Sequence, residues 1–157
     1  MTGPNPTDRG KPGTKYHIFC DRNGLPMHVL ASGANTHDSR LFVPLLQTNP
    51  GVRRGPGQRG RPRRRPEKLH ADKGYDYPRC RRYLHQRGIK VRIARRGIED
   101  KSKLGRFRWV VERTVSWLLR FKRLGLRYDR TEHTLRPLIT LASTMINVRR
   151  LVQVRGF

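Results

Sequence analysis

Two acidic residues stand at positions where a carboxylate could do chemistry, and the first of them is Asp72. It ends the short apolar segment Lys68–Asp72, within the run His-Ala-Asp-Lys-Gly-Tyr-Asp. We expect this segment to be a strand, and ligands and catalytic groups collect at the carboxyl ends of strands in α/β sheets. An aspartate at such a point can equally cap the turn that follows. Asp72 is therefore a candidate catalytic or metal-binding group, with turn capping as the alternative.

The second acidic residue, Glu112, lies in a run whose apolar residues have helical spacing. Its own helix face is polar, because Arg108, Ser116 and Arg120 recur at four-residue steps from it. Apolar residues fill most other positions, so we expect a helix covered on most sides and a half-buried Glu112. A half-buried glutamate flanked by arginine is suited to holding a metal ion or orienting a phosphate. The alternative is a surface ion pair with Arg108, which stabilises a helix by roughly 0.2–0.5 kcal/mol.

The composition points to a polyanionic partner. The 157 residues include 36 Lys and Arg against 11 Asp and Glu, a formal net charge of +25. Such a charge destabilises a compact state unless polyanions neutralise it, and phosphate contacts do so with release of counterions. No apolar stretch approaches the roughly 20 residues of a membrane-spanning helix, and no signal peptide is evident. We therefore expect nucleic acid as the partner and no membrane.

Residues 49–66 hold the densest basic cluster. The stretch is rich in Gly and Pro, contains no acidic residue, and predicts a flexible loop. We expect this arginine-rich loop to track phosphates without reading sequence, since such segments often become ordered on binding. Its arginines are Arg53, Arg54, Arg59, Arg61, Arg63, Arg64 and Arg65.

The elements that must position these residues read as an α/β fold. Thr14–Asp21 and Leu25–Ser32 alternate as strands on either side of Asn23-Gly24, which predicts an antiparallel hairpin. Asp38–Leu46 is typical of a short helix capped by Asp38 or Thr36. Asp21 is expected to cap the hairpin turn.

The second half continues with strand, helix and strand. Lys68–Asp72, Tyr77–Arg87 and Ile89–Ala94 predict a parallel βαβ unit, with Gly88 just past the end of its helix. Two helices follow, over about Leu104–Leu124 and Thr134–Val152. The first is expected to bury Phe107, Val111, Val115 and Leu118. We expect one domain over residues 14–152, after an N-terminal arm over 1–13 and before a tail over 153–157.

Other residue types give weaker signals. His17, His37 and His70 fit no standard structural zinc spacing, so we expect no zinc site. Tyr75 and Tyr77 could stack on bases, with simple packing as the alternative. The two cysteines, Cys20 and Cys80, lie in no ligand spacing and read as the reduced thiols of a cytosolic protein.

Three runs of the sequence carry a resemblance to known proteins. They are GPNPTDRGKPGTKYHIFCDRNGLPMHVLASGANTHDS, LHADKGYDY and RIARRG followed by GRFRWVVERTVSWLLRFKRLGLRYDR. Together they resemble one family, the transposases of bacterial insertion sequences that have an RNase H-like DDE domain. They occur in the family's order, and the resemblance covers about residues 3–151. The second matches the segment that holds the family's second catalytic Asp, here Asp72. The third matches the segment of the third carboxylate, here Glu112.

The resemblance implies metal-dependent cleavage and joining of DNA strands. Three carboxylates of an RNase H-like fold bind two Mg²⁺ ions, which activate the attacking oxygen and stabilise the departing one. Asp72 and Glu112 would be catalytic residues and metal ligands, with Arg108 and Arg120 gripping the DNA backbone. The full set of expected DNA-binding residues is Arg108, Arg120, Arg113, Lys73, Arg63, Arg64 and Arg65.

The resemblance also implies that parts are missing. The family's first catalytic Asp lies on a central first strand, upstream of the GPNP segment with which this sequence begins. We therefore expect an incomplete RNase H-like fold: a β-hairpin, a helix, a βαβ unit and two C-terminal helices, without the central strand. The family's N-terminal DNA-binding region would be absent as well.

Two functions from different classes follow. The first is a DDE transposase whose isolated chain is inactive and whose first Asp comes from an upstream transposase fragment. Its partners would be transposon ends and target DNA, in a homo-oligomer when complete, in the cytoplasm with the nucleoid. The second is a non-catalytic basic DNA-binding remnant or interfering fragment. Metal-dependent DNA cleavage would separate the two.

Overall fold

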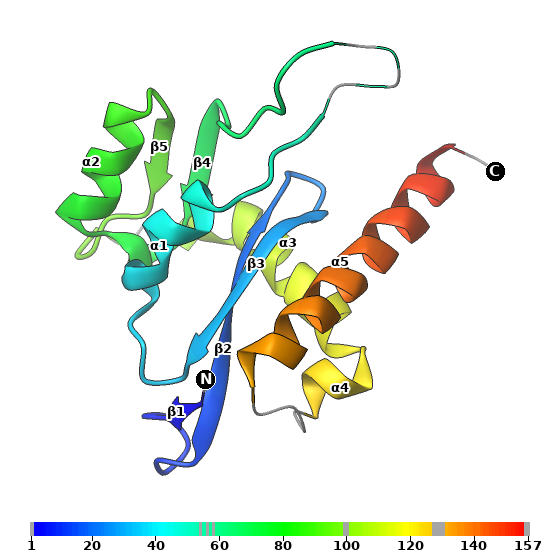
Figure 1. The fold of residues 1–157 in the computed structure, drawn as a ribbon. Helices are drawn as coiled ribbons and strands as arrows, with labels where there is room; N and C mark the ends of the chain where they lie inside the picture. Colours follow the sequence, from blue (N-terminus) through cyan, green and yellow to red (C-terminus); the bar gives the residue numbers. More distant parts are fainter. Residues whose placement is uncertain are drawn as a thin grey trace. The chain divides into compact units, whose positions relative to one another are not determined.

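The computed structural model describes residues 2–53, 55, 57, 59–98, 101–126 and 131–155, with side chains left out at 101–108 and 154–155. Within these residues the chain is a mixed α/β protein with two small sheets (Figure 1). It divides into two compact units. Unit 1 comprises residues 1–36 and 110–157, and unit 2 comprises residues 37–109. The predicted α/β class is confirmed, and the RNase H-like assembly stays a prediction of the resemblance.

Unit 1 is built on the predicted hairpin. Strands β2 (Pro12–Cys20) and β3 (Pro26–Gly33) pair antiparallel, with Ile18 opposite Val29 and Tyr16 opposite Ala31. Asp21 caps the turn as predicted, since its Oδ1 accepts the backbone N–H groups of Asn23 and Leu25 at 2.8 Å each. Gly24 has φ +82°, the left-handed conformation that favours glycine.

The N-terminal segment is not wholly an arm. Strand β1 (Gly3–Pro4) pairs antiparallel with Gly13 and Pro12, so β2 begins two residues earlier than predicted. The side chain of Asn5 accepts the Thr7 N–H, and Arg9 and Gly10 have positive φ. These local turn contacts fold residues 5–11 back, and they are hard to distinguish from a loop by composition alone.

Helices α4 (Lys122–Gly125) and α5 (Glu132–Arg155) complete unit 1, together with the part of α3 (Lys101–Leu119) from residue 110 onward. Helix α5 runs beside β3 (Figure 1). The hairpin face that carries Tyr16, Ile18, Val29 and Ala31 packs against the core of these helices. The buried residues of this core are Val29, Leu118, Leu124, Leu135, Ile139, Ala142 and Ile146.

The helix predicted over Leu104–Leu124 is in fact two helices. Phe121 has φ −74° and ψ 108°, an extended conformation that separates α3 from α4. The extended residue lets both Leu118 and Leu124 reach the core, at 2% and 3% exposure. The predicted burial of Val111 is wrong, because Val111 is 41% exposed while Val110 is buried. Phe107 lies outside the described side chains.

Thr114 joins α3 to the hairpin turn. Its side chain is fully buried, and its hydroxyl lies 2.8 Å from the Gly24 carbonyl and 2.9 Å from the Val110 carbonyl. We expect Thr114→Val to lower the free energy of unfolding by about 1–2 kcal/mol, because the buried Gly24 carbonyl loses a donor at unchanged side-chain volume. Urea denaturation followed by circular dichroism measures this difference.

The matched control for this variant is Thr140→Val on α5. Thr140 is exposed, and its hydroxyl donates only within its own helix, to the Arg136 carbonyl at 3.0 Å. We expect a change within about 0.5 kcal/mol there. Equal effects of the two variants would show that the Thr114–Gly24 contact adds nothing to stability.

Unit 2 contains the predicted βαβ unit. Strands β4 (Lys68–Ala71) and β5 (Lys90–Ile93) pair in parallel, with Leu69 opposite Val91. Helix α2 (Pro78–Gln86) connects them and flanks β5 (Figure 1). Gly88 has φ +61°, as expected just past the end of a helix. The buried apolar residues of unit 2 are Phe42, Leu45, Leu46, Leu69, Cys80, Leu84, Ile89 and Ile93.

Helix α1 (Asp38–Gln47) begins where the sequence predicted, but its cap is His37. The Nδ1 atom of His37 accepts the Ser39 N–H at 3.3 Å, so the prediction of Asp38 or Thr36 as the cap is wrong. Residues 49–66 form no helix or strand within the described part, apart from one bridge between Val52 and Arg63. In the described residues, no helix is both long enough and apolar enough to span a membrane.

Candidate functional site

Asp72 lies directly after β4, at the carboxyl end of this parallel strand. It caps the 3₁₀ turn η1 (Lys73–Tyr75), since its Oδ1 accepts the Gly74 N–H at 2.9 Å. The side chain is exposed. In the described part of the chain, its second oxygen accepts no hydrogen bond. Turn capping and a chemical role are thus compatible, because one oxygen fixes the carboxylate and the other is open to a ligand.

A second carboxylate, that of Asp38, also lies close to Gly74. A β-carbon on Gly74 would lie 3.0 Å from Asp72 Oδ1 and 3.8 Å from Asp38 Oδ2. Asp38 stands at the first position of α1, and this helix contacts η1. Burial, with Asp38 and Asp72 adding to it, raises the pKa of the Tyr75 hydroxyl. Tyr75 packs on Phe42 at 5.3 Å between ring centroids, which agrees with the packing alternative for this tyrosine.

The other aspartate of the same run, Asp76, is engaged by cations. Its two oxygens accept the Arg96 N–H at 2.9 Å and the Arg81 guanidinium at 2.7 Å. These hydrogen bonds, led by the one from Arg96, lower the pKa of the Asp76 carboxyl. Asp76 therefore holds the segment after β5 against η1, and Asp72 is the acid of this run that faces solvent.

Glu112 lies on α3, in the part of that helix that belongs to unit 1. Its side chain is exposed, so the expectation that it is half-buried is wrong. The predicted covering of the helix is wrong as well, since Trp109 is 50% and Val111 41% exposed. The helix uses Val110, Thr114 and Leu118 as its buried face, which leaves the face of Glu112 to solvent.

The polar stripe around Glu112 is shorter than predicted. Ser116 is exposed on the same helix, but α3 ends at Leu119 and Arg120 follows in the turn. Arg120 is exposed there, with its backbone N–H bonded to the Ser116 carbonyl at 3.2 Å. The side chain of Arg108 lies outside the described residues.

Arg113, the neighbour of Glu112, contacts its own unit. Its Nη2 donates to the Asn23 carbonyl at 2.6 Å, and its guanidinium lies 4.8 Å from the centre of the Trp117 ring. It therefore helps to hold the hairpin turn on α3. A contact between Arg113 and DNA stays a prediction.

The remaining predicted DNA-binding residues lie in unit 2. Arg63, Arg64 and Arg65 are exposed, and Arg65 donates to the Arg87 carbonyl at 3.2 Å. Lys73 is half-buried in η1, next to Asp72. Contacts between these side chains and DNA stay predictions.

The two predicted catalytic carboxylates thus fall in different units, Asp72 in unit 2 and Glu112 in unit 1. The described residues contain no group of three His, Cys, Asp or Glu side chains that could hold a metal ion. Each carboxylate is exposed at the end or on the face of a regular element. Such positions suit ligands of a hard cation, because hard cations prefer oxygen donors.

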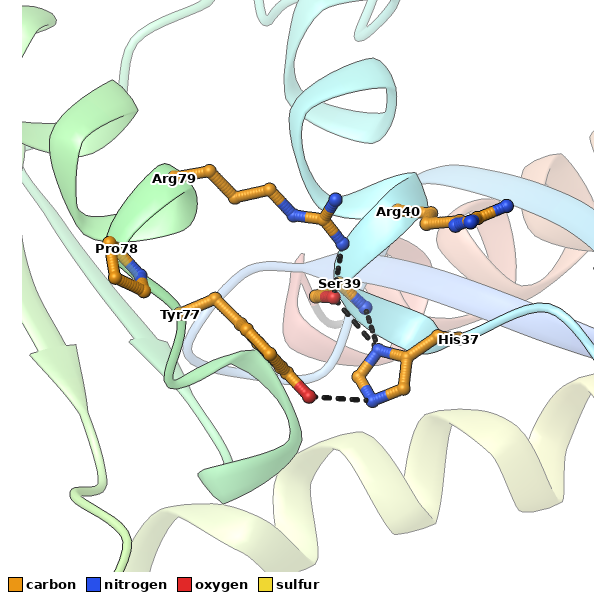
Figure 2. Close-up of a pocket in the computed structure, with 6 residues that line it drawn as sticks. All are labelled: His37, Ser39, Arg40, Tyr77, Pro78 and Arg79. Carbon is orange, nitrogen blue, oxygen red and sulfur yellow. Dashed lines mark hydrogen bonds between the residues drawn. The ribbon is translucent and has the colours of Figure 1, made fainter.

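Sequence reasoning missed a second group in unit 2, which lines a pocket of about 400 Å³ (Figure 2). Its members come from the starts of α1 and α2, some 40 residues apart in the chain. Among these pocket residues, the sequence pattern could have identified only His37, as a polar residue directly before a helix. The lining residues are His37, Ser39, Arg40, Tyr77, Pro78 and Arg79.

Comparisons with known proteins find matches over most of the chain. Residues 2–147 match the family described as the transposase DDE domain. Over 129 residues the chain is 50% identical to a Burkholderia cepacia protein named as the transposase assigned to insertion sequence element IS402. The match covers 82% of this chain and 60% of that relative's length. No solved structure matches the chain.

Proposed function

Because the chain belongs to the family of transposase DDE domains, we propose that it supplies Asp72 and Glu112 to a site that cleaves and joins DNA strands with Mg²⁺. The observation that carries this proposal is the placement of Asp72. It follows a parallel strand, one carboxylate oxygen is held by the Gly74 N–H, and the side chain faces solvent. This is how a metal ligand is fixed while an oxygen stays open for coordination.

The donor set fits the metal. Asp72 and Glu112 offer exposed carboxylate oxygens, which Mg²⁺ prefers over nitrogen and sulfur donors. When bound, the metal lowers the pKa of an attacking water or hydroxyl and offsets charge on the departing oxygen. The protein side chains hold the carboxylates in place and bring the DNA phosphate to them.

Arginine and lysine side chains supply the grip on the DNA. The formal net charge of +25 favours binding to a phosphate backbone, and exposed arginines suit it because their planar forks match phosphate oxygens. We assign DNA contacts to Arg108, Arg113 and Arg120 near Glu112, and to Lys73 near Asp72. Arg63, Arg64 and Arg65 of the arginine-rich loop would bind the backbone further along. The protein would act at the nucleoid.

We assign the third carboxylate of the site to sequence outside these 157 residues. In the family that the sequence resembles, a third carboxylate, the first catalytic Asp, lies upstream of the segment that matches GPNP. The relative from Burkholderia cepacia extends beyond the matched region by 40% of its length, since the match covers 60% of it. A polypeptide encoded upstream, and a homo-oligomer of the completed enzyme, would provide the remaining parts.

The experiment is a nicking assay. The purified chain is incubated with a supercoiled plasmid that carries the element's ends, alone and together with the polypeptide encoded directly upstream. We expect nicking in the mixture that requires Mg²⁺ and stops on addition of EDTA. Nicking that continues in EDTA would contradict a metal-dependent site.

A second function is favoured by the high positive charge. It is DNA binding without catalysis, as an interfering fragment. It predicts salt-sensitive binding, no nicking under either condition, and binding unchanged by Asp72→Asn.

Gly74→Ala tests whether the exact position of the Asp72 carboxylate matters for cleavage. The added β-carbon would lie 3.0 Å from Asp72 Oδ1, closer than ordinary van der Waals contact, so the carboxylate must shift. We expect Mg²⁺-dependent nicking to fall by about tenfold, because displacement of a catalytic group by a fraction of an ångström is costly. Initial nicking rates measure the effect.

The matched control for Gly74→Ala is Gly55→Ala, where the added β-carbon meets no atom within 4 Å. Nicking should be unchanged in this control. A Gly74→Ala chain that nicks at the wild-type rate would mean that Asp72 is not held in a catalytic geometry by its turn.

A further inference from the structure

The pocket at the starts of α1 and α2 has the chemistry of a phosphate site. We propose that it binds a phosphodiester group of the DNA backbone, apart from the two catalytic carboxylates. Its lining contains Arg40, Arg79, His37, Tyr77 and Ser39, together with Pro78, and no carboxylate. Figure 2 shows the Arg79 side chain reaching from α2 to Ser39, with the Tyr77 hydroxyl directed at the His37 ring.

Proton positions in the pocket leave a donor for a ligand. The Ser39 N–H donates to His37 Nδ1, so in the neutral ring the proton is on Nε2. His37 Nε2 lies 3.0 Å from the Tyr77 hydroxyl oxygen, to which Arg96 Nη2 also donates at 2.9 Å. The tyrosine oxygen thus accepts two hydrogen bonds, and its own O–H proton is directed elsewhere. A phosphate oxygen is a suitable acceptor for that proton.

The positive charge at the pocket comes from arginine side chains. Arg79 donates from Nη2 to Ser39 Oγ at 2.5 Å, which uses one of the five N–H groups of a guanidinium. Arg96 lies over the Tyr77 ring at 4.5 Å from its centre and holds this ring in place. Arg40, on α1, extends away from Arg79 on the other side of Ser39 (Figure 2). Two exposed arginines thus line the pocket on either side of the buried Ser39, and their remaining N–H groups are donors for an anion.

The backbone at the starts of the two helices also favours an anion. Helices α1, of ten residues, and α2, of nine, both begin at this pocket. Tyr77 gives α2 no side-chain cap. Pro78 has no N–H and the Cys80 N–H donates to the Tyr77 carbonyl at 3.0 Å, so the Arg79 N–H is the donor of the first turn that is open to an external acceptor within the described residues. The nearest acid in sequence to the tyrosine, Asp76, is already engaged by Arg81 and Arg96.

The pocket belongs to the same unit as Asp72. The turn η1 lies between the two in sequence, and Arg96 links them because its Nε donates to the Lys73 carbonyl at 3.3 Å. A DNA strand held at the pocket would therefore be anchored on the unit that carries Asp72. This inference rests on the proposed function for the identity of the anion as DNA.

The experiment measures DNA affinity against salt. The full chain is titrated with a 20-base-pair duplex in EDTA at several KCl concentrations, as wild type and as Arg79→Gln. Each phosphate contact contributes about 0.9 to the slope of log K against log salt. We expect Arg79→Gln to reduce the magnitude of this slope by about 0.9, and to lower affinity on the order of tenfold at low salt.

The matched control is Arg82→Gln, which removes the same charge from an exposed position of the same helix outside the pocket. We expect no comparable slope change there. A second pocket variant, Arg40→Gln, covers the case in which Arg79→Gln unfolds the unit. Tyr77→Phe should weaken binding with the slope unchanged, because it removes a hydrogen bond and no charge.

Three results would overturn the inference. Equal slope changes in Arg79→Gln and Arg82→Gln would mean diffuse attraction, and no change in Arg79→Gln or Arg40→Gln would mean that no phosphate binds there. Phosphorus NMR that shows inorganic phosphate bound at the pocket, with no slope change for DNA, would identify a small-anion site. Because the titration contains no Mg²⁺ and is repeated with Asp72→Asn, failure of the catalytic proposal leaves its outcome intact.

Discussion

Glu112→Gln is expected to reduce Mg²⁺-dependent nicking by at least about a thousandfold, and Asp72→Asn to do the same. Either change replaces the carboxylate group by a carboxamide group of the same shape, which removes the negative charge that holds the metal. Metal ions contribute several kcal/mol to the stabilisation of charge in phosphoryl transfer, and each 1.36 kcal/mol corresponds to about a factor of ten in rate. We therefore expect these two variants to lower the nicking rate more than any other exchange of a carboxylate for a carboxamide in this chain.

Nicking rates are measured on the chain mixed with its upstream polypeptide, at equal protein concentration. The matched control is Glu132→Gln, the same exchange at an exposed glutamate that pairs with Arg136 on the surface of α5. This control should nick at the wild-type rate. DNA affinity should be similar in all three variants, since each removes one exposed negative charge. Continued nicking by Glu112→Gln would remove Glu112 from the site.

Leu135→Ala is expected to destabilise unit 1 by about 3 kcal/mol. Leu135 is 1% exposed in the core formed by β3, α3, α4 and α5. Truncation removes buried apolar area and leaves a cavity that neighbouring helices fill only in part, and such changes cost about 2–5 kcal/mol. Urea denaturation followed by circular dichroism at the helix band measures the loss.

The same exchange on the same helix provides the control. Leu141 is 58% exposed on α5, and Leu141→Ala should change stability by no more than about 0.5 kcal/mol. If Leu135→Ala lowered the free energy of unfolding as little as Leu141→Ala does, the result would contradict the packing of Leu135 in the core of unit 1.

Elements with strong local signals could be predicted from the sequence. Asn23-Gly24 between two alternating segments identified the hairpin, because this turn signal is local to the sequence. The βαβ unit followed from short segments with turn residues between them, and Gly88 marked the end of α2. Asp21 was identified correctly as a turn cap for the same local reason.

Features that depend on contacts between distant residues could not be predicted. His37 caps α1 while it also bonds Tyr77, which is 40 positions away, and no pattern within α1 announces this. The separation of α3 from α4 lets Leu118 and Leu124 share a core with α5, so helical spacing alone extended the helix too far. Glu112 was expected to be half-buried because neighbouring apolar residues were assigned to the covered side, yet Trp109 and Val111 are exposed.

The division of the chain also bears on the order in which it folds during synthesis. Unit 2 is contiguous, residues 37–109, whereas unit 1 needs both ends of the chain. Two hydrogen bonds span most of that length: Tyr16 Oη to the Leu124 carbonyl, and Asn147 Nδ2 to the Pro26 carbonyl. Such contacts must wait for closure of a long loop. The apolar face of the hairpin is therefore synthesised before helices α4 and α5, which cover it, and it stays uncovered until they have been made.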